Sequence, residues 1–189
     1  MRPDAAAEDR ANGALARASR AAALPDVAVV VGPLRSWILA SMRISVAADE
    51  LTGIAPALVA ELERRGHETV AHGALSEHER DDWAWASEAA ARDVADGRAE
   101  QAIVCCWTGT GAAIAANKVP TVRAALCLDA PSAEGARRWN DANALALSLR
   151  ATSEAELLEI LDAWFAADPS SDAGDRANVD HLREIERGG

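Results

Sequence analysis

"QAIVCCWTGTGAAIAANK", residues 101–118, contains the transition on which the fold depends. An apolar run ends in Cys105 and Cys106, a turn containing Gly109 and Gly111 follows, and the remainder has the composition of a short helix. A continuous apolar run that stops at a turn is typical of a strand buried on both faces. The stretch therefore predicts a strand, a tight turn and a helix, which is the repeating unit of an α/β sheet.

The same alternation extends to both sides of this stretch. Strand-like runs occupy 43–48, 68–72, 101–106, 122–127 and 144–149, and helix-like runs occupy 54–65, 82–96, 110–118, 132–139 and 153–166. Apolar strands separated by helical crossovers indicate parallel pairing with both faces covered. We predict an α/β fold: a three-layer, doubly wound (Rossmann-like), five-stranded parallel sheet with helices on both faces.

The two ends of the chain differ from this pattern. Residues 1–41 are rich in Ala and Arg and show no clear periodicity, so we interpret them as an N-terminal extension without an assigned function. The α/β domain is predicted over 42–167. Residues 168–189 form a polar C-terminal tail, which we expect to begin as a loop and to end in a short helix at "NVDHLREIE", 178–186.

Composition limits the partners that this chain can bind. Its 189 residues carry a formal net charge of −11, with a pI near 4.8. Such a charge opposes binding to nucleic acid and to anionic membrane surfaces, although a local basic pocket could still hold a small anion. No apolar run reaches the roughly 20 residues that a membrane span needs, and acidic residues near the N-terminus argue against a signal peptide.

Cysteine and histidine usage bears on location and on metals. The three cysteines are odd in number and lack the spacing of a zinc site, which fits a reducing compartment, so we expect a cytoplasmic protein. The four histidines include no pair at the i, i+4 spacing of a helical metal site. We therefore expect no metal site.

Cys105 and Cys106 are the first candidates for chemistry. Side chains alternate across a strand, so these two point to opposite faces and only one can face the turn. The start of a helix carries partial positive charge, which would favour a thiolate there. The alternative is that both cysteines are ordinary core residues, as apolar cysteines often are.

"GTGAAI", 109–114, also resembles part of a dinucleotide fingerprint, with Asp129 lying 20 residues beyond Gly109. However, Ile114 stands where a third small residue belongs, and the turn follows the third strand instead of the first. A nucleotide-binding oxidoreductase is therefore the weakest of the alternatives.

A longer pattern points to a known family. "CWTGTGAAIAANKVPTVRAALCLDAPSAEGARRWNDANALAL", 106–147, resembles the type B ribose-5-phosphate isomerases and their galactose-6-phosphate isomerase relatives. "RGHETVAHGA", 65–74, fits the segment before it, and the similarity covers about 42–167. The resemblance implies an aldose–ketose isomerase of a sugar phosphate, similar to ribose 5-phosphate, that works without a metal or an organic cofactor.

The resemblance also implies roles for the residues of the turn. Cys106 would be the general base that moves a proton between C1 and C2 through a cis-enediolate. Thr108, with the backbone amides of Gly109, Thr110 and Gly111, would form the anion hole that stabilises the developing negative charge.

Three further matches concern substrate binding. Asn140, in "WNDAN", matches an asparagine that contacts sugar hydroxyls, and Arg150 matches an arginine that binds phosphate. Arg176 loosely matches an arginine that the family supplies across a dimer interface. A guanidinium group suits a phosphate because its planar fork can donate two parallel hydrogen bonds. The resemblance thus implies a homodimer, with a tetramer as the alternative.

Some positions depart from the family pattern. Glu50 follows Asp49 where the family has a histidine, Trp139 replaces a second histidine, and Trp83 replaces a tyrosine. A tryptophan cannot exchange protons as histidine does. We expect these four residues to contact the substrate, which suggests either an altered, linear sugar or a non-catalytic sugar-phosphate-binding protein. Packing at a subunit interface would explain Trp83, Trp107 and Trp139 equally well.

Overall fold

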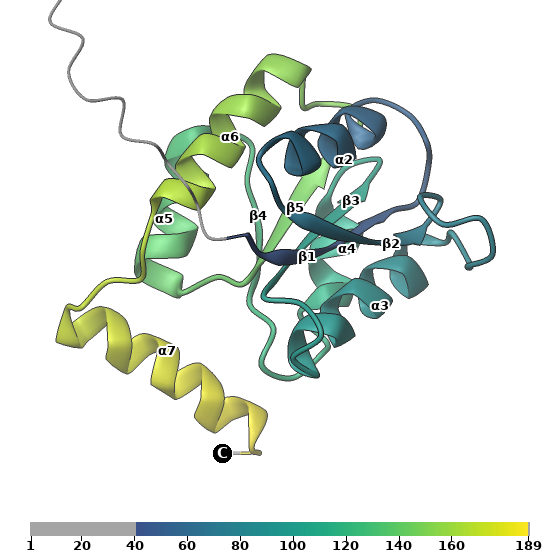
Figure 1. Cartoon of the computed structure of the whole chain (residues 1–189). Helices are drawn as coiled ribbons and strands as arrows, with labels where there is room; N and C mark the ends of the chain where they lie inside the picture. The colour runs from purple at the N-terminus through teal and green to yellow at the C-terminus, as the bar shows by residue number, and fades with distance from the viewer. Residues whose placement is uncertain (1–40, 189) are drawn as a thin grey trace, which may run out of the picture. The chain divides into compact units, whose positions relative to one another are not determined.

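The computed structural model describes residues 41–188, which form five strands and six helices (Figure 1). The strands are β1 (Arg43–Ala48), β2 (Glu68–Gly73), β3 (Gln101–Cys106), β4 (Ala124–Leu126) and β5 (Ala144–Ser148). The helices are α2 (Ala55–Arg64), α3 (Trp83–Ala95), α4 (Thr110–Ala116), α5 (Ala130–Asn140), α6 (Glu154–Ala166) and α7 (Ala173–Glu186). Of the predicted N-terminal extension, 1–41, only Ser41 lies within this range.

The strands form one parallel sheet in the order β2-β1-β3-β5-β4. β1 lies between β2 and β3, so the chain leaves β1 toward one edge and then returns to its other side. This reversal is the switch point at which doubly wound sheets bind ligands, outside the carboxyl ends of the strands. The predicted fold class is confirmed.

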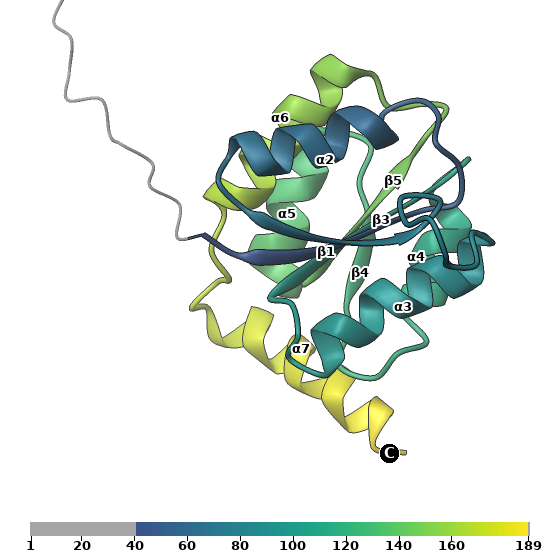
Figure 2. The same ribbon diagram turned by 45° about the vertical axis from the view of Figure 1, so that its right-hand side comes forward.

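Helices cover both faces of the sheet, as Figure 2 shows. The core on one face is built from large aliphatic side chains of α2 and α6 and smaller ones of α5, with the strand residues between them. The other face is covered by α3 and α4, whose buried residues are almost all alanines. Small side chains let these two helices lie close to the strands. The result is a three-layer domain with two separate apolar cores.

Trp164 is fully buried on α6. Its indole Nε1 donates a hydrogen bond to Oε1 of Gln101, at 2.7 Å, so the polar atom of this side chain is satisfied inside the core. The same helix begins with a capping box in which Ser153 and Glu156 bond each other's backbone amides. Core packing therefore fixes the position of α6, and the capping box fixes where the helix begins.

The largest difference from the predicted elements concerns the C-terminal tail. α7 begins at Ala173, five residues before the expected helix, because the side chain of Asp172 caps the amides of Gly174 and Asp175. α7 lies beside α5, away from the sheet, and buries only Val179 (Figures 1 and 2). Within residues 41–188, no helix combines the length and apolarity that crossing a bilayer would require.

Candidate active site

Cys106 is the last residue of β3, at the carboxyl edge of the sheet. Its side chain packs in the alanine-rich core beneath α3 and α4, whereas Cys105 packs in the opposite core. The predicted opposite orientation of the two cysteines is thus confirmed, and both are free thiols. Cys106 is 4% exposed, and its Sγ accepts a hydrogen bond from the backbone amide of Ala112 at 3.4 Å. The thiol therefore faces the turn that follows it.

Gly109 makes that turn possible. Its φ of +75° lies in the left-handed region, and a Cβ at this position would come within 2.9 Å of the backbone of Leu147 and 2.6 Å of the Leu126 side chain. Only glycine satisfies both conditions without strain. The Gly109 amide donates to the carbonyl oxygen of Cys106 at 3.1 Å, so it is used within the turn and is not free to bind an oxyanion.

The next two amides, of Thr110 and Gly111, open α4 and donate no hydrogen bond to a backbone carbonyl within residues 41–188. The hydroxyl oxygens of Thr108 and Thr110 lie 2.7 Å apart on the exposed side of the turn. Trp83 covers Gly111, because a Cβ there would be 3.0 Å from its ring carbons. Two amides, two hydroxyls and one indole ring therefore border the turn.

β5, which pairs with β3, and the residues that follow it hold the turn in place. The carbonyl oxygen of Trp107 accepts hydrogen bonds from the Ser148 hydroxyl at 2.9 Å and from the Arg150 amide at 3.2 Å. The backbone of Arg150 therefore lies immediately beside the turn, and its side chain is exposed. The sequence alone did not indicate that Ser148 contacts the turn, because this contact depends on the pairing of β3 with β5.

Asp49 and Glu50 follow β1 at the same edge. Ala48 pairs with Cys105, so Asp49 and Cys106 continue neighbouring strands at the switch point. Burial, and then the charge of Glu50, raise the pKa of Asp49, while hydrogen bonding to the backbone, including that of Trp107, lowers it less. Within residues 41–188, one oxygen of Asp49, Oδ1, is buried without a hydrogen-bond partner. This carboxyl group can accept or hold a proton beside the turn.

Asp49 and Glu50 also line a hollow of about 440 Å³, together with the segment between β2 and α3. Cys106 is not among the side chains that line it. The hollow therefore lies at the ends of β1 and β2 on the carboxyl edge, and the segment 74–82 forms its far wall.

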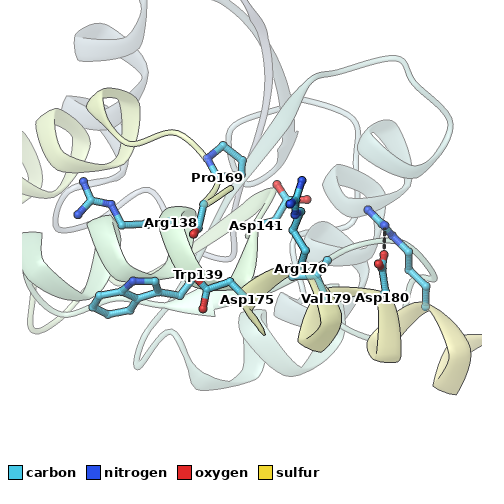
Figure 3. Close-up of a pocket in the computed structure, with 10 residues that line it drawn as sticks. Arg138, Trp139, Asp141, Pro169, Asp175, Arg176, Val179 and Asp180 are labelled. Atoms are coloured by element: carbon cyan, nitrogen blue, oxygen red, sulfur yellow. Dashed lines mark hydrogen bonds and ion pairs between the residues drawn. The ribbon is translucent and has the colours of Figure 1, made fainter. Parts of the chain in front are cut away.

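Trp139 and Arg176 lie together elsewhere, between α5 and α7 (Figure 3). They line a pocket of about 190 Å³ that also includes Arg138 and Arg183. Asn140 ends α5 beside them and precedes β5, so this group lies at the amino end of the sheet. Cys106 pairs with the last residue of β5, roughly 13 Å further along that strand at about 3.3 Å per residue.

Within one chain, the predicted site residues therefore lie in two separate groups. The carboxyl-edge group contains Asp49, Glu50, Trp83, Cys106, Thr108, Gly109, Thr110, Gly111 and Arg150. The amino-end group contains Trp139, Asn140 and Arg176. Asp129, the candidate ribose ligand of a dinucleotide site, is used instead to cap α5, because its Oδ1 accepts a hydrogen bond from the Ser132 amide at 2.8 Å.

Sequence reasoning missed a polar network next to the carboxyl-edge group, formed by Ser45, His72, Glu79, Asp93 and Arg98. Its members come from two strands, a helix and two connecting segments, so no local spacing could have indicated it. Within residues 41–188, no three His, Cys, Asp or Glu side chains are arranged to hold a metal ion.

A thiol, a glycine turn and a half-buried carboxyl group at the switch point of a doubly wound sheet define an α/β enzyme that acts on a small molecule. A family model described as ribose/galactose isomerase matches residues 44–182. The chain belongs to this family, and with it to the intramolecular oxidoreductases, a class of isomerases.

Individual relatives agree. Ribose-5-phosphate isomerase B of Escherichia coli is 38% identical over 110 residues, which are 58% of this chain and 73% of the relative. The structure of Clostridium thermocellum ribose-5-phosphate isomerase B superposes with a TM-score of 0.70 at 33% identity. The match covers 77% of this chain and 98% of that chain. D-Erythrulose-4-phosphate isomerase of Pectobacterium atrosepticum is 41% identical over 78 residues, which are 41% of this chain and 51% of that protein.

Proposed function

We propose that this protein interconverts an aldose and a ketose of a sugar phosphate, with Cys106 as the general base. The observation that carries the proposal is the position of the thiol, at the switch point and hydrogen-bonded to the first turn of α4. The membership of the isomerase family supports the reaction type.

In the proposed reaction the Cys106 thiolate removes the proton from C2 of the open-chain aldose. The C–H electron pair forms the C1–C2 double bond, and the carbonyl electrons move to O1, giving a cis-enediolate. The amides of Thr110 and Gly111 and the Thr108 hydroxyl stabilise the negative oxygen. The thiol then returns the proton to C1, while the O2 proton passes to O1, and the ketose results. Asp49, whose pKa burial raises, is suited to contact these hydroxyls.

The second group of residues supports a homodimer. Trp139, Asn140 and Arg176 lie at the amino end of the sheet and cannot reach a substrate held by Cys106 of the same chain. We propose that a second copy supplies them, with Arg176 binding the phosphate and Asn140 the sugar hydroxyls. Arg150, beside the turn, would hold the phosphate from the first chain.

A linear substrate is the second candidate. Ring opening requires a group that exchanges protons with the ring oxygen, and the exposed indole of Trp139 cannot do so. A four-carbon sugar phosphorylated at O4 has no free hydroxyl with which to close a five-membered ring, and one relative is named for such a substrate. Turnover of erythrulose 4-phosphate with a kcat/KM at least tenfold above that for ribose 5-phosphate would favour this candidate.

Solvent deuterium incorporation tests the proposed function. Pentose and tetrose phosphates are incubated in D₂O with the wild-type protein, with Cys106→Ala and with Cys105→Ala as the matched control, and the label at C1 and C2 is read by NMR. Label should appear with the wild type and with Cys105→Ala and vanish with Cys106→Ala. Binding of a sugar phosphate without any label would indicate a non-catalytic binding protein instead.

A further inference from the structure

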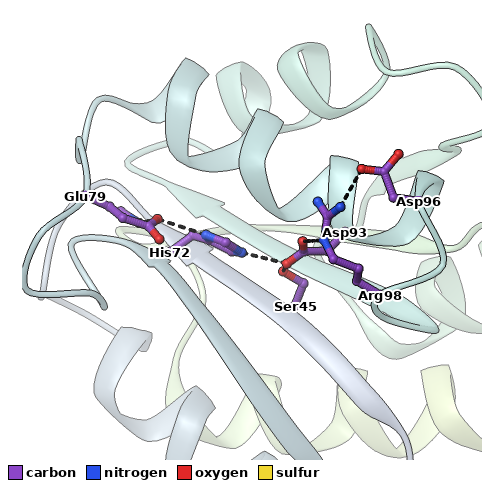
Figure 4. A network of polar contacts seen from close by, with 7 residues as sticks. Ser45, His72, Glu79, Asp93, Asp96 and Arg98 are labelled. Carbon is purple, nitrogen blue, oxygen red and sulfur yellow. Dashed lines mark hydrogen bonds and ion pairs between the residues drawn. The ribbon is translucent and has the colours of Figure 1, made fainter.

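A row of three side chains connects the surface segment 74–82 to the interior (Figure 4). Nδ1 of His72 lies 2.8 Å from Oε2 of Glu79, and Nε2 of the same ring lies 2.7 Å from Oδ2 of Asp93. Glu79 belongs to the surface segment, His72 to β2 and Asp93 to α3. His72 is therefore the link between a carboxylate on the surface and a carboxylate in the core.

Asp93 is a fixed end for this link. Its side chain is 7% exposed and accepts hydrogen bonds from the Ser45 hydroxyl at 2.8 Å and from Nε of Arg98 at 2.7 Å. Burial raises the pKa of Asp93, but the hydrogen bonds from His72, Arg98 and Ser45 outweigh it and hold the pKa below its ordinary value. A carboxylate held by three partners from different elements cannot turn, so it fixes the ring of His72.

The two nitrogens of His72 lie on opposite edges of the ring, and each is within hydrogen-bond distance of a carboxylate oxygen. A single histidine side chain can therefore bridge two carboxylates that come from different elements. Glu79 receives a further hydrogen bond from the Gly73 amide at 3.3 Å. These contacts join Glu79 to the end of β2.

The segment that Glu79 belongs to borders the proposed active site. With Asp49 and Glu50 it lines the hollow at the carboxyl edge. It also leads directly into Trp83, the ring that covers Gly111 in the catalytic turn. The position of this segment therefore sets the shape of the hollow and the place of the indole ring.

We infer that His72 is a positioning residue for the isomerase reaction, which holds the segment 74–82 against the carboxyl edge by joining Glu79 to Asp93. The inference rests on the proposed function for its effect on turnover, whereas the anchoring itself does not. His72 acts through Glu79 and touches no substrate. Without the link, the hollow loses its wall and substrate binding weakens, while proton transfer at Cys106 is unaffected once substrate is bound.

Two single variants break the link from opposite sides. Glu79→Ala removes the surface carboxylate and leaves Asp93 with all its partners. His72→Gln keeps an amide near the position of Nε2, for Asp93, and loses the donor that faces Glu79. His78→Ala is the matched control, because His78 is an exposed histidine of the same segment with no hydrogen bond to residues 41–188.

Three quantities are measured for each variant: KM and kcat for the sugar phosphate turned over, hydrogen exchange of the amides in 74–82, and the midpoint of denaturant unfolding. Both variants should raise KM about tenfold with kcat within about twofold of wild type, and should speed exchange in this segment. The double variant should resemble either single variant, because both remove the same contact. His78→Ala should match the wild type throughout.

The inference is overturned if Glu79→Ala shows wild-type exchange in 74–82, or if kcat and KM change only together with a general loss of stability. A wild-type protein without turnover on any sugar phosphate would refute the proposed function instead. In that case the exchange measurement alone still decides whether His72 anchors the segment.

Discussion

The backbone amide of Ala112 donates a hydrogen bond to the sulfur of Cys106, with 3.4 Å between the two atoms. Six residues separate the donor from the acceptor, so the contact closes the whole glycine turn between β3 and α4. The contact therefore fixes the position of the sulfur relative to the turn that borders the proposed active site.

The two adjacent cysteines should differ sharply in their effect on activity. Cys106→Ala should lower kcat/KM by about 10²- to 10⁴-fold, the usual contribution of a general base. Cys105→Ala should keep activity near that of the wild type, because Cys105 packs in the opposite core. Steady-state kinetics with denaturant unfolding checks this prediction. Equal losses in the two variants would refute the assignment of the base.

Replacement of Gly109 should separate conformational strain from steric conflict. Gly109→Ala places a methyl group within 2.9 Å of the Leu147 backbone at a φ of +75°, whereas Gly97→Ala has a φ of +71° and no atom within 4 Å. Gly97→Ala should cost about 1–2 kcal/mol of unfolding free energy, and Gly109→Ala distinctly more, with loss of activity. Denaturant unfolding of both variants measures the difference. Equal costs would show that the turn can relax around the added methyl group.

The other two thiols should resist alkylation in the folded protein. Burial, and then the charge of Asp129, raise the pKa of Cys127 to about 11, and burial raises the pKa of Cys105 further. Since the thiolate is the nucleophile, iodoacetamide at pH 8 should leave both unmodified until the protein unfolds. Peptide mass spectrometry gives the site of each adduct. Labelling of Cys105 in the native state would contradict the packing described for it.

His67 should make the protein less stable in mild acid. Burial, and then the charge of Arg65, lower its pKa below the ordinary 6.5. His67 therefore binds a proton more readily in the unfolded chain than in the folded chain. The free energy of unfolding that is present above pH 6.5 is lost as the pH falls toward the folded pKa. His67→Leu should flatten the dependence of unfolding free energy on pH, by at most about 1.4 kcal/mol per pH unit.

Denaturant unfolding between pH 7 and pH 5 measures this slope. The surface variant His78→Ala should keep the wild-type slope, because His78 is exposed. An unchanged slope in His67→Leu would mean that other groups cause the acid sensitivity.

Mixing inactive chains should restore activity if two copies share a site. Cys106→Ala lacks the proposed base and Arg176→Ala the proposed phosphate ligand, and each homodimer should be inactive. After unfolding and refolding together, half of the dimers are mixed and each has one intact site, so about a quarter of the wild-type activity should return. No recovery, or full activity of Arg176→Ala alone, would contradict a site built from two chains.

Local patterns in the sequence predicted most elements closely. The strands at 43–48 and 101–106 have the predicted bounds, because their apolar runs are continuous and end at turn residues. The start of α7 was wrong by five residues, because Gly174 in the first turn obscured the cap formed by Asp172. Capping by a side chain is read from geometry more readily than from sequence.

The site was predicted less completely. The resemblance supplied the list of residues, but it could not show that Cys106 and Arg176 lie at opposite ends of the sheet. Nor could spacing along the chain reveal that His72 joins Glu79 to Asp93, since these residues lie on three different elements. Such contacts depend on how helices and strands pack, which local sequence does not encode.

The sequence by itself determined the alternation of strands and helices, the opposite orientation of Cys105 and Cys106, and the turn that only Gly109 permits. These features follow from the two-residue period of a strand and from the sterics of single residues. Only the tertiary structure decided that Asp49 continues the strand beside Cys106 and that Trp139 lies far from both. Strand order is set by crossovers that bring distant segments together, and burial of both sheet faces selects among them.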